Sequence, residues 1–463
     1  MSLPSGEYWQ QFRQTWVLAF PIIMGQLGQM LMGWVDNIMV GRVGVVPLAA
    51  CAFANIVLHV PFLFGVGVLT AVSVQTSHHF GAKNFVLAGK ILRAGLLIAL
   101  ILGIGVFALF LGFSPFLSLL GQNAEVTAEA RPFIIIVGAS LIPVYLTLTA
   151  KSFCEACARP WLPFWITLIG VAVNILINWL LIYGNWGLPT LGLTGAAWGT
   201  FIGRMVIVLM LFTVIFRAAG FRSWLPKTFF GGIAWSEIWS LLHLGVPTGL
   251  HLISEVGIFA VCATICGWIS VDALAAHQIV LTCAATAFMF PLGLAMALTI
   301  RVGQVMGAGQ AGLVRPICSQ AILGTTLMML CFASVFLILR KVIGYAFVDD
   351  QAVIALTAQL FFAVAAFQVF DGWQVVCVGA LRGLADVRVP FVFTLVAYWL
   401  VALPLAYFLG YKLWGAIGVW IALLTGLVVV SLPLIIRLWW KTKPGNLPTL
   451  TVKSDPLPEG GLL

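Results

Sequence analysis

Three acidic residues of this chain stand within long apolar runs: Asp36, Glu255 and Asp371. An acid removed from water resists ionisation, and a second acid close by strengthens that resistance. A bound proton or another cation removes the penalty. Because Glu255 and Asp371 both fall in the second half of the chain, they could face one cavity. The pair therefore predicts a site that exchanges a proton or Na⁺ and that also attracts cationic ligands.

The alternative for each acid is a structural role, in which a neighbour satisfies the carboxyl group permanently. For Asp36 that neighbour would be Asn37 or nearby backbone. Arg204, which also falls inside an apolar run, either pairs with a carboxylate or extends its charge out to water.

Histidines in the apolar runs are able to carry protons, although a lone histidine more often serves packing. They are His59, His243, His251 and His277. His251 precedes Glu255 by four residues and Phe259 follows it by four, so on a helix both share its face. We therefore expect Phe259 to line the same cavity as Glu255.

The amino-acid composition indicates that these residues lie in membrane-spanning segments. Only 8% of the 463 residues are charged and 62% are hydrophobic, whereas a soluble protein carries about 25% charged residues. This excludes a soluble enzyme, a disordered chain and a nucleic-acid-binding domain. The 23 Lys and Arg against 14 Asp and Glu lie between the apolar runs, which is typical of a membrane protein with many spans.

Twelve runs reach the ~20 apolar residues that a helix needs to cross a bilayer. They cover residues 15–40, 47–77, 89–113, 130–150, 161–183, 192–216, 238–269, 273–300, 317–339, 352–380, 389–410 and 414–436. The short alternating strands of an outer-membrane barrel are absent from the sequence. The fold class expected is an all-α polytopic membrane protein.

Basic residues in the connections predict the orientation. With the N-terminus inside, 17 Lys and Arg face the cytoplasm and five face the other side, which places both termini in the cytoplasm. The start of the chain lacks an early basic segment and a small-residue cleavage site, so we expect the first span to be retained. The polar tail from Pro444 to Leu463 is expected to be disordered.

The chain also contains an internal repeat at an offset of 226 residues. It aligns Pro21 with Pro247 and Gly67 with Gly293, and it aligns Leu48-Ala49-Ala50 with Leu274-Ala275-Ala276. Six helices per half give two parallel bundles related by a pseudo-twofold axis along the membrane normal. The predicted divisions are an N-lobe at 1–226, a C-lobe at 227–440 and a cytoplasmic tail at 441–463.

Motifs for enzymatic chemistry are missing from the sequence. No phosphate-binding G-x-x-x-x-G-K-[ST] loop, no H-E-x-x-H and no Ser/His/Asp cluster is found. Cys154 and Cys157 form the only C-x-x-C, without a second pair to complete a zinc site, and we expect them to pack as small apolar residues. Neither an enzyme nor a bound cofactor is expected.

Several stretches resemble one transporter family. Met32 to Gly41, Ala273 to Gln278, Thr299 to Gln304, and Phe367 to Asp371 with Gly379 to Gly383 resemble motifs of the multidrug and toxic compound extrusion (MATE) family. The resemblance covers residues 10–440 and is strongest to its NorM-type bacterial branch. It implies an inner-membrane, cation-coupled drug exporter with two six-helix lobes, alternating access and no cofactor besides the coupling ion.

The resemblance also implies roles for individual residues. Glu255, Asp371 and Asp36 correspond to cation-coupling acids of the family. Contacts to cationic drugs correspond to Asp371, Glu255, Gln278, Asp350, Asn55 and Phe259. Judged from the sequence alone, Asp349 and Asp350 could equally be two solvent-exposed loop residues without a role.

One position departs from some relatives and bears on the coupling ion. Where they have a tyrosine four residues before the tenth-helix acid, this chain has Phe367, which offers no oxygen. Na⁺ needs several oxygen ligands and a proton needs one carboxylate, so H⁺ is favoured, although backbone carbonyls or water could replace the missing ligand.

The alternative to drug export is the flipping of a lipid-linked oligosaccharide across the membrane. A flippase for lipid-linked oligosaccharide, from the wider superfamily, should have a basic cavity for pyrophosphate, whereas the central charges here are acidic. The partners expected are small cationic substrates and the lipid bilayer, with no nucleic acid, and the chain is expected to be a monomer.

Overall fold

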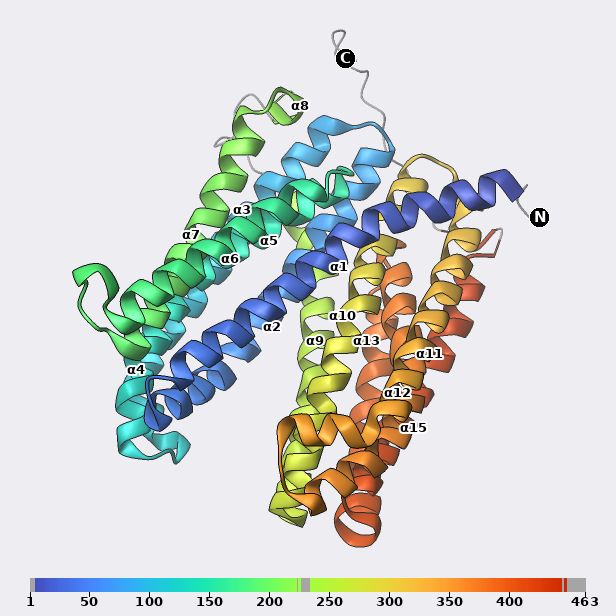
Figure 1. The fold of residues 1–463 in the computed structure, drawn as a ribbon. Coiled ribbons are helices and arrows are strands. Elements are labelled where there is room, and N and C mark those ends of the chain that lie inside the picture. Colours follow the sequence, from blue (N-terminus) through green and yellow to red (C-terminus); the bar gives the residue numbers. More distant parts are fainter. Residues whose placement is uncertain (1–4, 223, 226–233, 444, 448–463) are drawn as a thin grey trace. The chain divides into compact units, whose positions relative to one another are not determined.

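The computed structural model describes residues 5–222, 224–225, 234–443 and 445–447. These residues form helices and no strands (Figure 1). The helices are α1 Ser5–Gly41, α2 Val45–Gly81, α3 Phe85–Phe113, α4 Ala124–Ala139, α5 Leu141–Ala156, α6 Trp161–Tyr183, α7 Gly192–Arg217, α8 Ala219–Arg222, α9 Trp235–Ile269, α10 Val271–Gly307, α11 Val314–Phe347, α12 Gln351–Gly383, α13 Arg388–Leu395, α14 Leu403–Leu405 and α15 Gly415–Lys441. Three 3-10 helical segments (Ser114–Leu120, Asn185–Gly187, Ala311–Leu313) and two π-helical segments (Val396–Ala402, Ala406–Trp414) complete the order.

Eleven helices of the described part are long and apolar enough to cross a membrane. Because the bilayer offers no water to the backbone, helices keep every N–H and C=O satisfied within the segment. The last span, Arg388–Lys441, holds 54 residues and covers two of the predicted runs. The chain reverses inside it at Gly415, which has a φ of 62°, and Gly410 then packs on Val419.

The described residues pack into two compact units. One lies within Met24–Gly249, and the other within Met1–Ile23 and Leu250–Thr451. Two helices, α1 and α9, each pass from one unit to the other two residues after a proline, Pro21 and Pro247. Proline removes a backbone hydrogen bond and permits a bend at such a point. The predicted lobe boundary at 226–227 falls in residues 226–233, outside the described residues. Of the predicted disordered tail from Pro444 to Leu463, only residues 445–447 are described.

Glycines allow close helix crossings in both units. A Cβ on Gly67 of α2 would overlap the backbone of Gly249 of α9. In the other unit, a Cβ on Gly293 of α10 would lie 2.8 Å from the Cα of Ile23 in α1. At such positions only glycine lets two backbones approach, which is how small residues promote helix packing in membranes.

Each crossing also carries a polar contact near the helix end. Arg301 of α10 donates to the side-chain oxygens of Gln11 and Gln14 on α1, at 2.6 Å each. In the other unit, Gln75 of α2 donates to the hydroxyl of Ser240 on α9 at 2.9 Å. The crossing of α2 with α9 and that of α10 with α1 are thus similar. Each has a glycine at the closest approach and a polar contact nearer the helix ends.

One sequence expectation needs correction in α5. The fourth predicted span, residues 130–150, ends one residue before Lys151 and so places Lys151 in the following connection. The helix continues to Ala156, and Lys151 is buried and pairs with the buried Glu155 at 3.8 Å. The list of three intramembrane acids was therefore incomplete. Cys154 and Cys157 are buried free cysteines in the apolar core of this unit.

Candidate functional site

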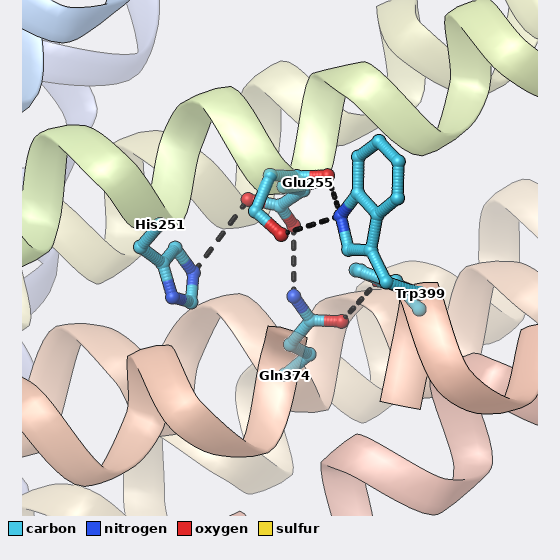
Figure 2. Close-up of polar contacts among 6 residues, drawn as sticks. His251, Glu255, Gln374 and Trp399 are labelled. Atoms are coloured by element: carbon cyan, nitrogen blue, oxygen red, sulfur yellow. Dashed lines mark hydrogen bonds and ion pairs between the residues drawn. The ribbon is translucent and has the colours of Figure 1, made fainter. Parts of the chain in front are cut away.

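Glu255 lies on α9 with its side chain 15% exposed and is held by neutral groups. The amide nitrogen of Gln374 on α12 donates to Glu255 Oε1 at 2.8 Å (Figure 2). The hydroxyl of Tyr398 donates in turn to the Gln374 carbonyl oxygen at 2.6 Å. This second bond fixes which end of the Gln374 amide faces the acid.

Tyr398 and its neighbour Trp399 belong to the π-helical segment Val396–Ala402. The wider turn occurs shortly before Pro404, which cannot donate a backbone hydrogen bond. From this segment the indole nitrogen of Trp399 donates to the Ser254 hydroxyl at 2.8 Å, next to Glu255 (Figure 2). The π-helical segment thus holds two neighbours of Glu255, Gln374 and Ser254, from a segment separate from both α9 and α12.

Basic groups near Glu255 are few. The closest is the buried His251, whose Nε2 lies 3.7 Å from Glu255 Oε2, one turn away as the sequence predicts (Figure 2). Arg382 acts on Glu255 only at longer range. Among the described residues, no arginine or lysine forms an ion pair within 4.0 Å of Glu255 or Asp371.

Asp371 is brought beside Glu255 by the pairing of α9 with α12. It lies on α12 between Phe367 and Gln374 and is 6% exposed. Gln374 bonds Glu255, and the ring of Phe367 meets that of Phe259 with centroids 6.1 Å apart. The charge of Glu255 acts on Asp371. None of the described residues donates a hydrogen bond to Asp371, so two acids share one apolar setting with little internal compensation.

Asp36 belongs to a different cluster, in the unit within Met24–Gly249. The amide nitrogen of Asn178 on α6 donates to Asp36 Oδ1 at 2.6 Å, and it also lies 3.4 Å from the Asn174 oxygen. The partner is therefore Asn178 rather than the adjacent Asn37, whose side-chain oxygen lies 3.9 Å from the Cys51 sulfur.

The other predicted contact residues, Gln278, Asn55 and Asp350, form no hydrogen bond with the three acids among the described residues. Gln278 and Asn55 have exposed side chains, and Asn55 contacts the Cys51 sulfur at 3.5 Å. Asp350 is exposed and caps the N-terminus of α12, accepting from the backbone N–H of Ala352 and Val353 at 2.8 and 3.2 Å. This cap is a structural role, and the predicted contacts of these three residues with substrate stay predictions.

Several residues of the clusters were not predicted from the sequence. Gln374, Tyr398, Trp399 and Asn178 hold the acids, yet none was singled out. Their common signal was a hydrogen-bonding side chain within an apolar run, where an unsatisfied polar group costs several kcal/mol. The described residues include no group of three or more His, Cys, Asp or Glu that could hold a metal ion.

The role of Tyr398 can be tested directly. Tyr398→Phe removes the hydroxyl that orients Gln374, and a hydrogen bond of about 1 kcal/mol corresponds to roughly fivefold in rate. If the chain exports cationic drugs, as the sequence resemblance implies, ethidium export from cells should slow by about that factor. As a control, Trp373→Phe removes a bond of similar length, from Trp373 to Thr326 (2.8 Å), without touching Gln374. Equal effects of the two variants would contradict a positioning role.

Comparison with known proteins places the chain in a family. A sequence model of the MatE family matches two segments, residues 21–180 and 247–408. The probable multidrug resistance protein NorM of Bradyrhizobium diazoefficiens is 34% identical over 441 residues, covering 94% of each chain. The multidrug resistance protein PmpM of Pseudomonas aeruginosa is 33% identical, over 92% of this chain and 91% of PmpM.

Solved structures agree on the fold. The Vibrio cholerae MATE transporter VcmN superimposes with a TM-score of 0.84 at 21% identity, over 94% of this chain and 98% of that one. The family match and the NorM relative, together with the eleven helices long and apolar enough to cross a membrane, make the chain a multi-pass bacterial membrane protein and a transporter. The chain belongs to the MatE family of multidrug and toxic compound extrusion transporters, in its NorM-type bacterial branch.

Proposed function

We propose that this chain exports organic cations across the bacterial inner membrane in exchange for protons. The observation that carries the proposal is the acid pair of Glu255 and Asp371. The neutral amide of Gln374 donates to Glu255, and among the described residues no arginine or lysine forms an ion pair within 4.0 Å of either acid. The one basic group that close is the imidazole of His251, 3.7 Å from Glu255. Because a buried negative charge is unstable without compensation, positive charge must come from outside, as a proton or as a cationic substrate.

A transport cycle follows from this competition. With the acids ionised, the site holds an organic cation, and the aromatic rings of Phe259 and Phe367 offer apolar faces nearby. Protonation removes the negative charge and weakens the hold on the substrate, which favours its release outside. Since each ligand lowers the affinity for the other, the effect is reciprocal.

The surroundings of Asp371 favour a proton over Na⁺ as the coupling ion. Phe367, one turn before Asp371, packs against Phe259 and Trp420 and brings no oxygen. Na⁺ needs several oxygen ligands, whereas one carboxylate suffices for a proton.

We propose that alternating access uses two similar halves of six helices. The two matches to the family model begin 226 residues apart. The crossings of α2 with α9 and of α10 with α1 are related by the same offset, because Gly67 pairs with Gly293 and Ile23 with Gly249. Counting the reversal at Gly415 as the end of one crossing gives twelve spans. An even number, with the basic residues of the sequence, supports both termini in the cytoplasm.

The chain is proposed to act as a monomer, because residues of one chain complete both acid clusters. The function is tested by following ethidium transport in proteoliposomes with an imposed pH gradient or Na⁺ gradient. We expect the pH gradient alone to drive export and the Na⁺ gradient at equal pH to fail. Export driven by Na⁺ alone would overturn the coupling ion, and no transport under either gradient would overturn cation export.

A further inference from the structure

Arg204 of α7 lies beside the Asp36 cluster and is not part of the cycle described above. The glycines of α7 pack it closely on α6. Gly199 meets the Asn178 side chain, and a Cβ on Gly203 would lie 2.9 Å from the Cβ of Asn174. Arg204 follows Gly203 directly and so lies in the same turn of α7 as the glycine that packs on Asn174.

Arg204 is held in place by a buried hydroxyl. Its Nη1 donates to Ser140 Oγ at 2.5 Å, and the Ser140 hydroxyl donates to the carbonyl of Val137 at 2.6 Å. Ser140 is fully buried at the junction of α4 and α5. Among the described residues, the acid whose charge acts on the guanidinium is Asp36, so Asp36 is the acid whose charge it compensates.

The two groups that act on Asp36 among the described residues, the Asn178 amide and the Arg204 guanidinium, are both hydrogen-bond donors. Asn178 turns its N–H toward the acid. The Asn178 carbonyl oxygen instead faces Gly199 of α7 and is buried without a hydrogen-bond partner among the described residues. Na⁺ binds oxygen atoms, and it would find the acid already facing an amide and a guanidinium.

The positive charge of Arg204 also opposes the binding of Na⁺ beside Asp36. A repulsion of about 2.7 kcal/mol, less than that of two like unit charges about 4 Å apart at an effective dielectric constant of about 20, weakens binding of the second charge roughly 100-fold. A proton on Asp36 neutralises the acid without needing space for an ion or oxygen ligands. We propose that Arg204 is the resident counter-ion of Asp36 and makes this cluster selective for a proton over Na⁺.

The proposal deepens the proposed function, since it concerns the ion preference of one coupling acid, and its test does not depend on transport. Binding of a sodium radiotracer to the purified protein is compared for the parent, Asp36→Asn, Arg204→Gln and the double variant. We expect Asp36→Asn to bind as much Na⁺ as the parent. Arg204→Gln should gain a site of roughly 100-fold higher Na⁺ affinity, and the double variant should lose it.

Two further variants keep the test decisive if Arg204→Gln folds poorly. Arg204→Lys retains the charge and should bind Na⁺ like the parent. Ser140→Ala releases the guanidinium from its anchor and should bind Na⁺ more tightly than the parent. The proposal is overturned if Asp36→Asn removes Na⁺ binding from the parent, or if neither Arg204→Gln nor Ser140→Ala gains an Asp36-dependent site. A failure of drug export alone would affect only the proposed function.

Discussion

Replacing Asp371 by asparagine is expected to lower pH-driven ethidium export by at least about 100-fold, to the rate of vesicles without transporter. Asparagine matches aspartate in size but neither attracts a cation nor takes up a proton, so both ligands of the proposed cycle lose their common partner. The rate is measured as ethidium efflux from proteoliposomes with an imposed pH gradient. Glu255→Gln should behave in the same way.

Asp272→Asn is the matched control for this change. Asp272 is exposed in the first turn of α10. Removing its charge should leave export within about twofold of the parent, as for most surface substitutions. If Asp371→Asn and Glu255→Gln both exported at the rate of Asp272→Asn, the acid pair would have no part in coupling.

The second large effect concerns folding rather than transport. The Cβ that Gly67→Leu adds would overlap the backbone of Gly249 and lie 2.8 Å from the carbonyl carbon of Thr248. A backbone cannot rotate away as a side chain can, so we expect a loss of stability of about 3 kcal/mol or more. Thermal unfolding of the purified protein in detergent, followed by tryptophan fluorescence, measures the loss.

Gly105→Leu provides the comparison at another helical glycine. Gly105 of α3 is exposed, and a Cβ there meets nothing within 4 Å. Leucine should be neutral or slightly stabilising at that position, since it also favours the helix more than glycine does. Equal melting temperatures for the two variants would show that α2 and α9 do not cross closely at Gly67.

The sequence was sufficient to predict the helices and the acids at the centre of the site. A membrane forces long apolar runs, and an acid inside one is conspicuous because its burial is so unfavourable. The spacing of His251 and Phe259 around Glu255 could also be read directly, because residues four apart on a helix share a face. These features depend on one segment at a time.

The groups that hold the acids depend on contacts between distant segments. Gln374 is 119 positions from Glu255, and Asn178 is 142 positions from Asp36. The π-helical segment that presents Tyr398 depends on how the chain accommodates Pro404 and has no simple periodic signal. In α5, ending the span at residue 150 hid the pair of Lys151 and Glu155, although their spacing of four was visible.

The central claim is that proton and drug exclude each other at Glu255 and Asp371. The most direct test measures ethidium binding to the purified protein at several pH values, together with the protons released on binding. Ethidium keeps its charge throughout, so any pH dependence belongs to the protein. We predict that affinity rises with pH and that binding releases protons, and that Asp371→Asn weakens both effects. Binding that is independent of pH and releases no proton would contradict the account.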